Sequence, residues 1–195
     1  MTEKRAYTMR ARAAAKDATR DRILRSFRDL AKERMTIEIT LDDVAERAST
    51  TVQTVLRHFR SRDGLFDAAL AVATVEVEEQ KRAPVGDTAA ALRAIVDHYD
   101  DQGDFVVRLL AQEDDERIQR IVGPGKAQHR RWVQEVFAPQ LALSSDTEAL
   151  TDALVVATDV YAWKLLRRDR GLDRDTTEHR MRGLVEAVLA YDDRP

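Results

Sequence analysis

Residues 40–62 read TLDDVAERASTTVQTVLRHFRSR, and this stretch decides the fold. It contains two short amphipathic segments, 41–48 and 52–59, joined by the three polar residues 49–51. Thr40 and Thr51 stand just before them, where a hydroxyl can accept a hydrogen bond from the first turn of a helix. A helix of about eight residues is not stable alone, so neighbouring helices must brace both segments. The stretch therefore predicts a helix-turn-helix.

The second of these segments has an apolar and a polar face. Val52, Val55 and Phe59 recur at helical spacing and are predicted to face inward. The opposite face carries side chains that can hydrogen-bond to base edges or phosphates: Gln53, Thr54, Arg57 and His58. A glutamine can pair with adenine, and an arginine with guanine, through two hydrogen bonds each. Such a face is otherwise a solvated surface, but within a helix-turn-helix it favours insertion into the major groove of DNA.

Longer helices are expected on both sides of this pair. Residues 19–34 carry apolar side chains at helical spacing, namely Ile23, Phe27, Leu30 and Ala31. Ser61 can cap a helix that continues into a connecting segment over 67–84. Residues 1–18 lack an apolar stripe and carry five basic residues, so they are predicted to form a flexible basic arm.

Residues 19–66 resemble the DNA-binding region of the tetracycline-repressor (TetR) family of regulators. The resemblance rests on residues at fixed spacing: Ile23, Phe27, Thr40, Val44, Ala45, Ala48, Thr51, Thr54, His58, Phe59, Arg62 and Leu65. It implies a helix-turn-helix DNA-binding domain, with phosphate contacts from Thr40, His58 and Arg62. Together with the polar face, it predicts these DNA-binding residues: Thr40, Thr51, Val52, Gln53, Thr54, Arg57, His58 and Arg62.

The sequence departs from the family pattern at the turn and in the second short helix. The family usually has glycine and valine where this chain has Ser49 and Thr50, so we expect Ser49 to adopt a conformation that suits glycine better. The family often has a phosphate-binding tyrosine where this chain has Leu56, so one backbone contact is expected to be missing. His58 and Arg62 are expected to compensate for it.

The composition excludes several other classes of protein. The 195 residues include no cysteine, which excludes disulfides, zinc–thiolate sites and thiol catalysis. No apolar run approaches the roughly 20 residues of a membrane span, and the charged N-terminus is unlike a signal peptide. We therefore expect a cytoplasmic protein with no membrane partner. Residues 1–65 hold 15 Lys and Arg against 10 Asp and Glu, whereas the remainder is acidic, which favours a polyanion at one end only.

The residues after Pro84 predict a second helical domain. Glycine (7) and proline (4) are scarce, which favours helices throughout. Apolar periodicity predicts five further helices, over 87–102, 104–112, 115–137, 147–168 and 175–191, with a break in the third at Gly123-Pro124-Gly125. The predicted fold is thus all-α, with about nine helices. Its parts are the arm (1–18), a three-helix DNA-binding domain (19–66), the connecting helix (67–84) and a C-terminal domain (85–195).

The resemblance implies that the C-terminal domain forms a homodimer and binds a small, largely apolar effector. Helix 147–168 agrees with dimerisation, because its apolar residues exceed one intramolecular stripe; the alternative is a central core helix. The predicted interface residues are Trp163, Leu166, Leu184 and Val188. The candidate pocket residues are Phe105, Leu109, Trp132, Val136, Phe137, Asp159 and Tyr161, and core packing explains each apolar one equally well. The implied function is a repressor that the effector releases from a palindromic operator in double-stranded DNA.

Two other classes of function are open at this point. A helical-bundle di-metal enzyme needs Glu-x-x-His sequences, and none of His58, His98, His129 and His179 follows a glutamate by three residues. The sequence also contains no HExxH, GxSxG or Gly-rich phosphate loop, so no catalytic residue, metal ligand or cofactor is predicted. A helical protein-interaction adaptor that has lost DNA binding is the other alternative, because of Thr50 and Leu56.

Overall fold

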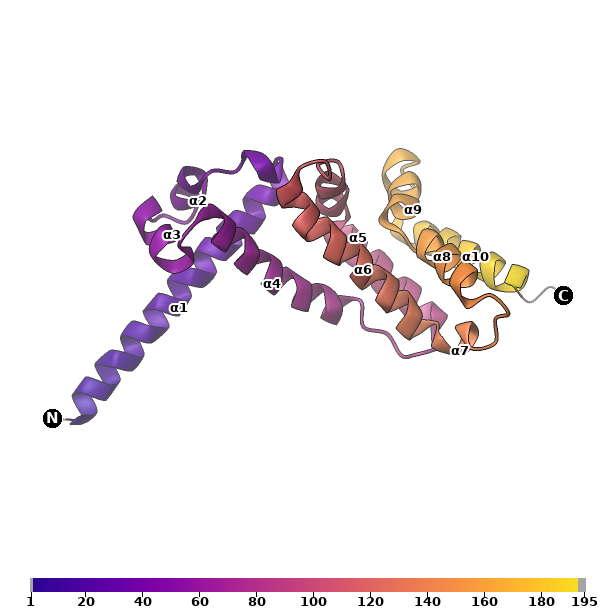
Figure 1. Ribbon diagram of the computed structural model, residues 1–195, viewed down its shortest axis with the longest axis horizontal. Helices are drawn as coiled ribbons and strands as arrows, with labels where there is room; N and C mark the ends of the chain where they lie inside the picture. Colours follow the sequence, from indigo (N-terminus) through magenta and orange to yellow (C-terminus); the bar gives the residue numbers. More distant parts are fainter. Residues whose placement is uncertain (1, 193–195) are drawn as a thin grey trace. The chain divides into compact units, whose positions relative to one another are not determined.

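The computed structural model describes residues 2–192, with side chains from Ala14 onward, and within that range the chain is built of helices without a strand (Figure 1). The predicted all-α fold is confirmed. The chain's contacts divide it into two compact units, Met1–Ala73 and Thr74–Pro195. The division falls inside a helix, within the segment 67–84 that was expected to connect two domains. In the described part of the chain, no helix combines the length and the apolar character needed to cross a membrane.

The first unit is a small helical domain around one apolar core. It consists of α1 (Thr2–Glu33), the 3-10 turn η1 (Thr36–Glu38), α2 (Leu41–Arg47), α3 (Val52–Phe59) and the first half of α4 (Arg62–Gln80). α2 and α3 pack against each other and against α1. Their core includes Ile23, Phe27, Leu30, Val44, Val55, Phe59, Leu65 and Phe66. The rings of Phe27 and Phe66 meet edge to face with centroids 5.9 Å apart, which ties α1 to α4.

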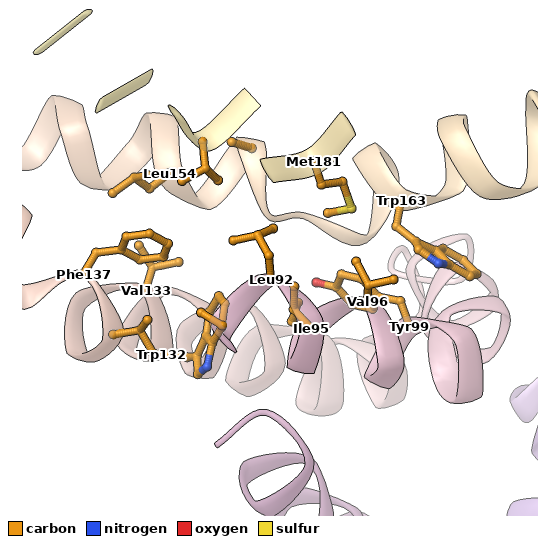
Figure 2. Close-up of a cluster of buried hydrophobic side chains, with 14 of the residues drawn as sticks. Leu92, Ile95, Val96, Tyr99, Trp132, Val133, Phe137, Leu154, Trp163 and Met181 are labelled. Atoms are coloured by element: carbon orange, nitrogen blue, oxygen red, sulfur yellow. The ribbon is translucent and has the colours of Figure 1, made fainter. Parts of the chain in front are cut away.

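The second unit surrounds α5 with the remaining helices. It contains α5 (Thr88–Leu110), α6 (Glu116–Val136), α7 (Ala138–Leu141), α8 (Thr147–Ala157), α9 (Val160–Lys164), the π-helical turn η2 (Leu165–Asp169) and α10 (Arg174–Asp192). α5 packs against α6, α9 and α10, and α8 packs against α6 and α10. Figure 2 shows the core between them, with side chains that include Leu92, Ile95, Trp132, Phe137, Leu154, Trp163 and Met181.

Aspartates fix where several helices of the second unit begin. Asp87, Asp115, Asp146 and Asp159 accept hydrogen bonds of 2.8–3.0 Å from backbone N–H groups in the first turns of α5, α6, α8 and α9. Each carboxylate satisfies an otherwise unpaired donor and opposes the positive end of the helix dipole. The last of these caps overturns one prediction, because it breaks the helix expected over 147–168 at Thr158-Asp159 into α8 and α9.

Two predicted helix breaks are wrong. α5 runs without interruption through Gly103, where separate helices over 87–102 and 104–112 were expected. α6 likewise continues through Gly123-Pro124-Gly125. Pro124 has no N–H to contribute to the helical ladder, but buried side chains on both sides of it hold the two halves of α6 in line.

The N-terminal residues also differ from their prediction as a flexible arm over 1–18. Residues 2–18 belong to α1, which begins at Thr2, and Met1 lies outside the described residues. Alanine, arginine and lysine predominate in this segment, and all three are strong helix formers. The absence of an apolar stripe therefore indicates that this segment is not buried, and it does not indicate that the segment is not helical.

Candidate nucleic-acid interface

The start of α2 is held by a reciprocal cap between Thr40 and Asp43. The hydroxyl oxygen of Thr40 accepts the Asp43 N–H at 3.2 Å, while the Asp43 carboxylate accepts the backbone N–H of Thr40 at 2.7 Å and its hydroxyl at 2.6 Å. Asp43 also pairs with Arg34 of α1 at 2.8 Å. The hydrogen bonds from Thr40 and the Arg34 guanidinium hold the pKa of the Asp43 carboxyl well below its usual range. Thr40 thus lies exposed at the start of α2 with its hydroxyl hydrogen already bonded.

The turn between α2 and α3 requires an unusual conformation of Ser49. Its φ of 49° lies in the left-handed region, as expected for a position where the family has glycine. This left-handed conformation costs a residue with a Cβ about 1–2 kcal/mol. The amides of Ser49 and Thr50 bond to the carbonyls of Glu46 and Ala45 at 3.0 and 2.9 Å, which closes the end of α2. Thr51 then caps α3, accepting the Thr54 N–H at 3.2 Å.

α3 buries one face and exposes the other. Val55 and Phe59 are buried, whereas positions 53, 56 and 57 are exposed and recur at the spacing of a single helix face. The structure therefore places the predicted base-contacting residues Gln53 and Arg57 side by side on the exposed face, with Thr54 and His58 half-buried at its edges. Leu56, where the family often has tyrosine, is 37% exposed in the middle of this face.

α1 brings two further cations to the C-terminal end of α3. The Arg20 guanidinium lies 5.4 Å from the centroid of the Phe59 ring. Burial, and then the positive charges of Arg57, Lys16 and Arg20, lower the pKa of His58. We call Lys16, Arg20, Arg57 and His58 the basic cluster. Sequence reasoning placed Lys16 on a flexible arm and missed Arg20; the available signal was the helical continuity of residues 16–20 with the stripe that follows.

Arg62 has a different task from the one predicted for it. Its guanidinium donates to the backbone carbonyls of Ile39, Thr36 and Ile37 at 2.8, 3.0 and 3.1 Å. Three of its five donors are thus used inside the protein. These bonds hold η1, the turn that leads into α2. The structure therefore gives Arg62 a positioning role, and its contact with a phosphate stays a prediction.

The predicted effector residues are only partly brought together. Trp132, Val136 and Phe137 lie in the core of the second unit, where the rings of Trp132 and Phe137 meet edge to face at 6.3 Å (Figure 2). On α5, Leu109 is buried and Phe105 is half-buried. Asp159 serves as the cap of α9, and Tyr161 is 48% exposed on that helix and is not part of the core.

The four residues predicted for the dimer interface differ in how far they are exposed. Trp163 is fully buried within one chain: its indole N–H donates to Asp100 at 2.9 Å, and its ring lies 6.0 Å from that of Tyr99. Its assignment to the dimer interface is wrong, because α5 already covers it. Leu166 and Val188 are half-buried against the core. Leu184 is 47% exposed on α10, and other exposed apolar side chains follow α8 to α10: Val156, Tyr161, Leu165 and Tyr191.

Two histidines of the second unit are buried. Burial lowers the pKa of His98 to about 3 and that of His129 to about 4. Nδ1 of His98 lies 2.9 Å from the side-chain oxygen of Gln80, and Nε2 of His129 lies 3.1 Å from the hydroxyl of Thr158. Among the side chains described, no group of three or more His, Asp or Glu is placed to hold a metal ion.

Comparisons with known proteins agree with this geometry. Residues 23–69 match the family model of bacterial regulatory proteins of the tetR family. A transcriptional regulator from Rhodococcus sp. Rha1 has the same fold, with a TM-score of 0.70 and 17% identity over 90% of this chain and 98% of that chain. A tetR-family transcriptional regulator from Streptomyces coelicolor matches with a TM-score of 0.69 and 18% identity over 91% of this chain and 84% of that chain. No curated protein matches the sequence.

Proposed function

We propose that this chain, whose residues 23–69 match the family model of bacterial regulatory proteins of the tetR family, is a TetR-family transcriptional repressor that a small molecule releases from its operator. The observation that carries the proposal is the exposed face of α3, flanked by the basic cluster. A short helix braced on its inner side leaves its outer side free to enter the major groove. The cations beside it supply the phosphate attraction on which DNA affinity depends.

The side chains of this surface divide between bases and phosphates. Gln53 and Arg57 occupy the exposed face of α3 and are assigned to base edges, with Thr54 beside them. Lys16, Arg20 and His58 lie at the end of that helix and are assigned to the phosphate backbone. Thr51, Val52 and Thr40, at the starts of α3 and α2, complete the proposed contact surface.

A homodimer is proposed because apolar side chains remain exposed along α8 to α10. Val156, Leu184 and Tyr191 are 70%, 47% and 73% exposed. Exposed apolar groups that gather on one surface mark sites of association. Burying them against a second copy creates two-fold symmetry, and a two-fold dimer selects a palindromic operator. Acting on chromosomal DNA, such a repressor works in the bacterial cytoplasm.

The proposed route from effector to operator is α4. This single helix contributes Leu65 and Phe66 to the core of the first unit. At its other end, within the second unit, Thr74 and Glu78 accept hydrogen bonds of 3.5 and 3.2 Å from Gln128 of α6. A ligand that shifts α4 changes the spacing of the two α3 helices in the dimer. Linkage then requires that operator DNA weaken effector binding by the same factor.

The test is to select genomic DNA fragments that the full-length protein binds, and then to measure affinities for the enriched sequence. Gln53→Ala is expected to change the preferred bases. Lys16→Ala is expected to weaken all sequences alike and to reduce the slope of log K against log salt by roughly 0.9. Arg131→Ala, which removes an exposed charge from α6 of the second unit, is the control and is expected to change neither.

Two results would refute this proposal. Enrichment of no DNA at all would favour the adaptor alternative. Wild-type binding by Gln53→Ala, Arg57→Ala and Lys16→Ala would show that α3 is not the recognition helix.

A further inference from the structure

Three basic side chains of the second unit are buried close enough for their charges to interact, and two of them lie against the ring of Trp132. Lys81, His98 and His129 are 5%, 5% and 9% exposed. The Lys81 ammonium lies 5.8 Å from the centroid of the Trp132 ring, and the His129 ring stacks on Trp132 at 5.6 Å with an interplanar angle of 17°. Thr158 joins the group through its hydrogen bond to His129. We call these five residues the Trp132 cluster.

Lys81 is buried, and the one acidic side chain that acts on its charge is Glu78 of α4. Burial lowers its pKa to about 8, so it is still largely charged at pH 7. Among the residues that the structure describes, it forms no ion pair. A buried charge is costly unless it is paired, and this protein pairs the buried carboxylate of Glu178 with both Arg174 and Arg182. The Lys81 ammonium thus lies over the Trp132 ring without an ion pair, where an anion could bind it.

His129 offers an unmatched acceptor in the same cluster. The Thr158 hydroxyl donates to the Leu154 carbonyl at 2.7 Å, so its oxygen must accept the hydrogen on Nε2 of His129. The Val155 carbonyl, 3.4 Å from Nε2, requires the same proton position. In the neutral ring Nδ1 is then a bare acceptor, and it is buried with no hydrogen-bond partner.

We propose that the Trp132 cluster is the effector site and that the effector is a small hydroxy acid with a planar apolar body. Its carboxylate accepts from the Lys81 ammonium, its hydroxyl donates to Nδ1 of His129, and its body packs against Trp132 and the adjoining core. This inference rests on the proposed function, since it names the chemistry of the effector that would release the proposed repressor from its operator.

The position of Lys81 in the chain explains how such a ligand would reach the site and act from it. Residues 81–87, between α4 and α5, are not helical, and the indole N–H of Trp132 donates to the Lys81 carbonyl at 2.8 Å. We assign the admission of the ligand to movement of this short segment. Because Lys81 directly follows α4, a ligand bonded to it acts on the helix that continues into the first unit.

The experiment titrates the full-length protein with matched probes. Binding is monitored by calorimetry and by tryptophan fluorescence. The probes are the three hydroxybenzoates, the corresponding hydroxybenzamides, benzoate and inorganic phosphate. At least one hydroxybenzoate is expected to bind about tenfold or more tightly than its amide and than benzoate. Phosphate, which has no apolar body, is expected not to bind.

Three variants assign the contacts. Lys81→Met should abolish the preference for carboxylate over amide, and His129→Phe, which keeps a ring beside Trp132, should abolish the preference for hydroxybenzoate over benzoate. Arg82→Met, which removes an exposed charge one residue along, should retain both preferences. Thermal unfolding of each variant checks that it folds.

The proposal is overturned if no hydroxybenzoate binds at about 10 mM, if the amides bind as well, or if Lys81→Met keeps the wild-type preference. Operator affinity is measured separately without any probe. Failure to bind DNA refutes the proposed function, whereas failure to prefer hydroxy acids refutes only this assignment.

Discussion

Gly103 lies in the middle of α5 against Trp163, and replacing it with alanine tests how tightly the second unit is packed. A Cβ at this position would lie 2.5, 2.6 and 2.9 Å from three carbons of the Trp163 ring. Ordinary contacts between carbons are about 3.5–4.0 Å, so the ring must retreat by roughly 1 Å. Trp163 is fully buried and tethered to Asp100 through its indole N–H, so it has little room to do so.

The expected change in the free energy of unfolding is the difference between two opposing contributions. Replacing glycine by alanine inside a helix stabilises by about 1 kcal/mol, while overpacking a core costs about 1–3 kcal/mol. Gly103→Ala should therefore lower the free energy of unfolding by up to about 2 kcal/mol. Gly125→Ala is the matched control, because Gly125 is also helical but exposed, with no atom within 4 Å of the added Cβ. It should be stabilising by about 1 kcal/mol.

The assay is urea unfolding followed by tryptophan fluorescence, with all variants at one protein concentration because association shifts stability. Trp132 and Trp163 both lie in the second unit, so the signal reports on the unit that contains both substitutions. The difference between the two variants isolates the contact with Trp163. Equal unfolding free energies for Gly103→Ala and Gly125→Ala would refute the packing argument.

Three other perturbations have defined outcomes. Arg62→Met should lower the melting temperature and weaken all operators without changing the salt slope, because Arg62 holds backbone carbonyls; a normal melting temperature with a reduced slope would instead support the phosphate contact. Leu184→Glu should dissociate the proposed dimer in sedimentation and weaken operator binding, whereas an unchanged association state would remove α10 from the proposed interface. Acid should destabilise the second unit, because His98 and His129 have pKa values of about 3 and 4 in the fold against 6.5 unfolded, so the unfolded chain binds more protons below pH 6.5. The loss is roughly 2 kcal/mol per histidine at pH 5, and a His129→Phe variant with the wild-type pH profile would contradict it.

Local signals predicted the first unit well. The cap residues Thr40 and Thr51 stand where the structure starts α2 and α3, and Ser49 adopts the left-handed conformation expected from the turn. These features depend on interactions within a few residues, which the sequence displays directly. The positioning role of Arg62 was missed because its carbonyl partners lie more than twenty residues earlier in the chain.

The second unit was harder to predict from the sequence, because its glycines and aromatic residues pack against residues far away in the chain. Gly103 was taken as a helix break, whereas it makes room for Trp163, which is 60 residues away in the sequence. The same contact removes Trp163 from the dimer interface. Asp159 was considered as a ligand contact, although Thr-Asp before an apolar run is also the signature of a helix start, which is the role it has.

The bonds from Arg62 to Thr36, Ile37 and Ile39 turn the chain between them into a closed loop. This protein has no cysteine, and the Arg62 guanidinium here closes the loop as a disulfide would. It links the two ends of the segment that contains α2, the turn between α2 and α3, and α3. The segment is consequently expected to open and close as one cooperative unit together with the first turn of α4. Amide hydrogens of α2 and α3 should then exchange with solvent at a common rate, and both helices should travel with α4 as a single rigid piece.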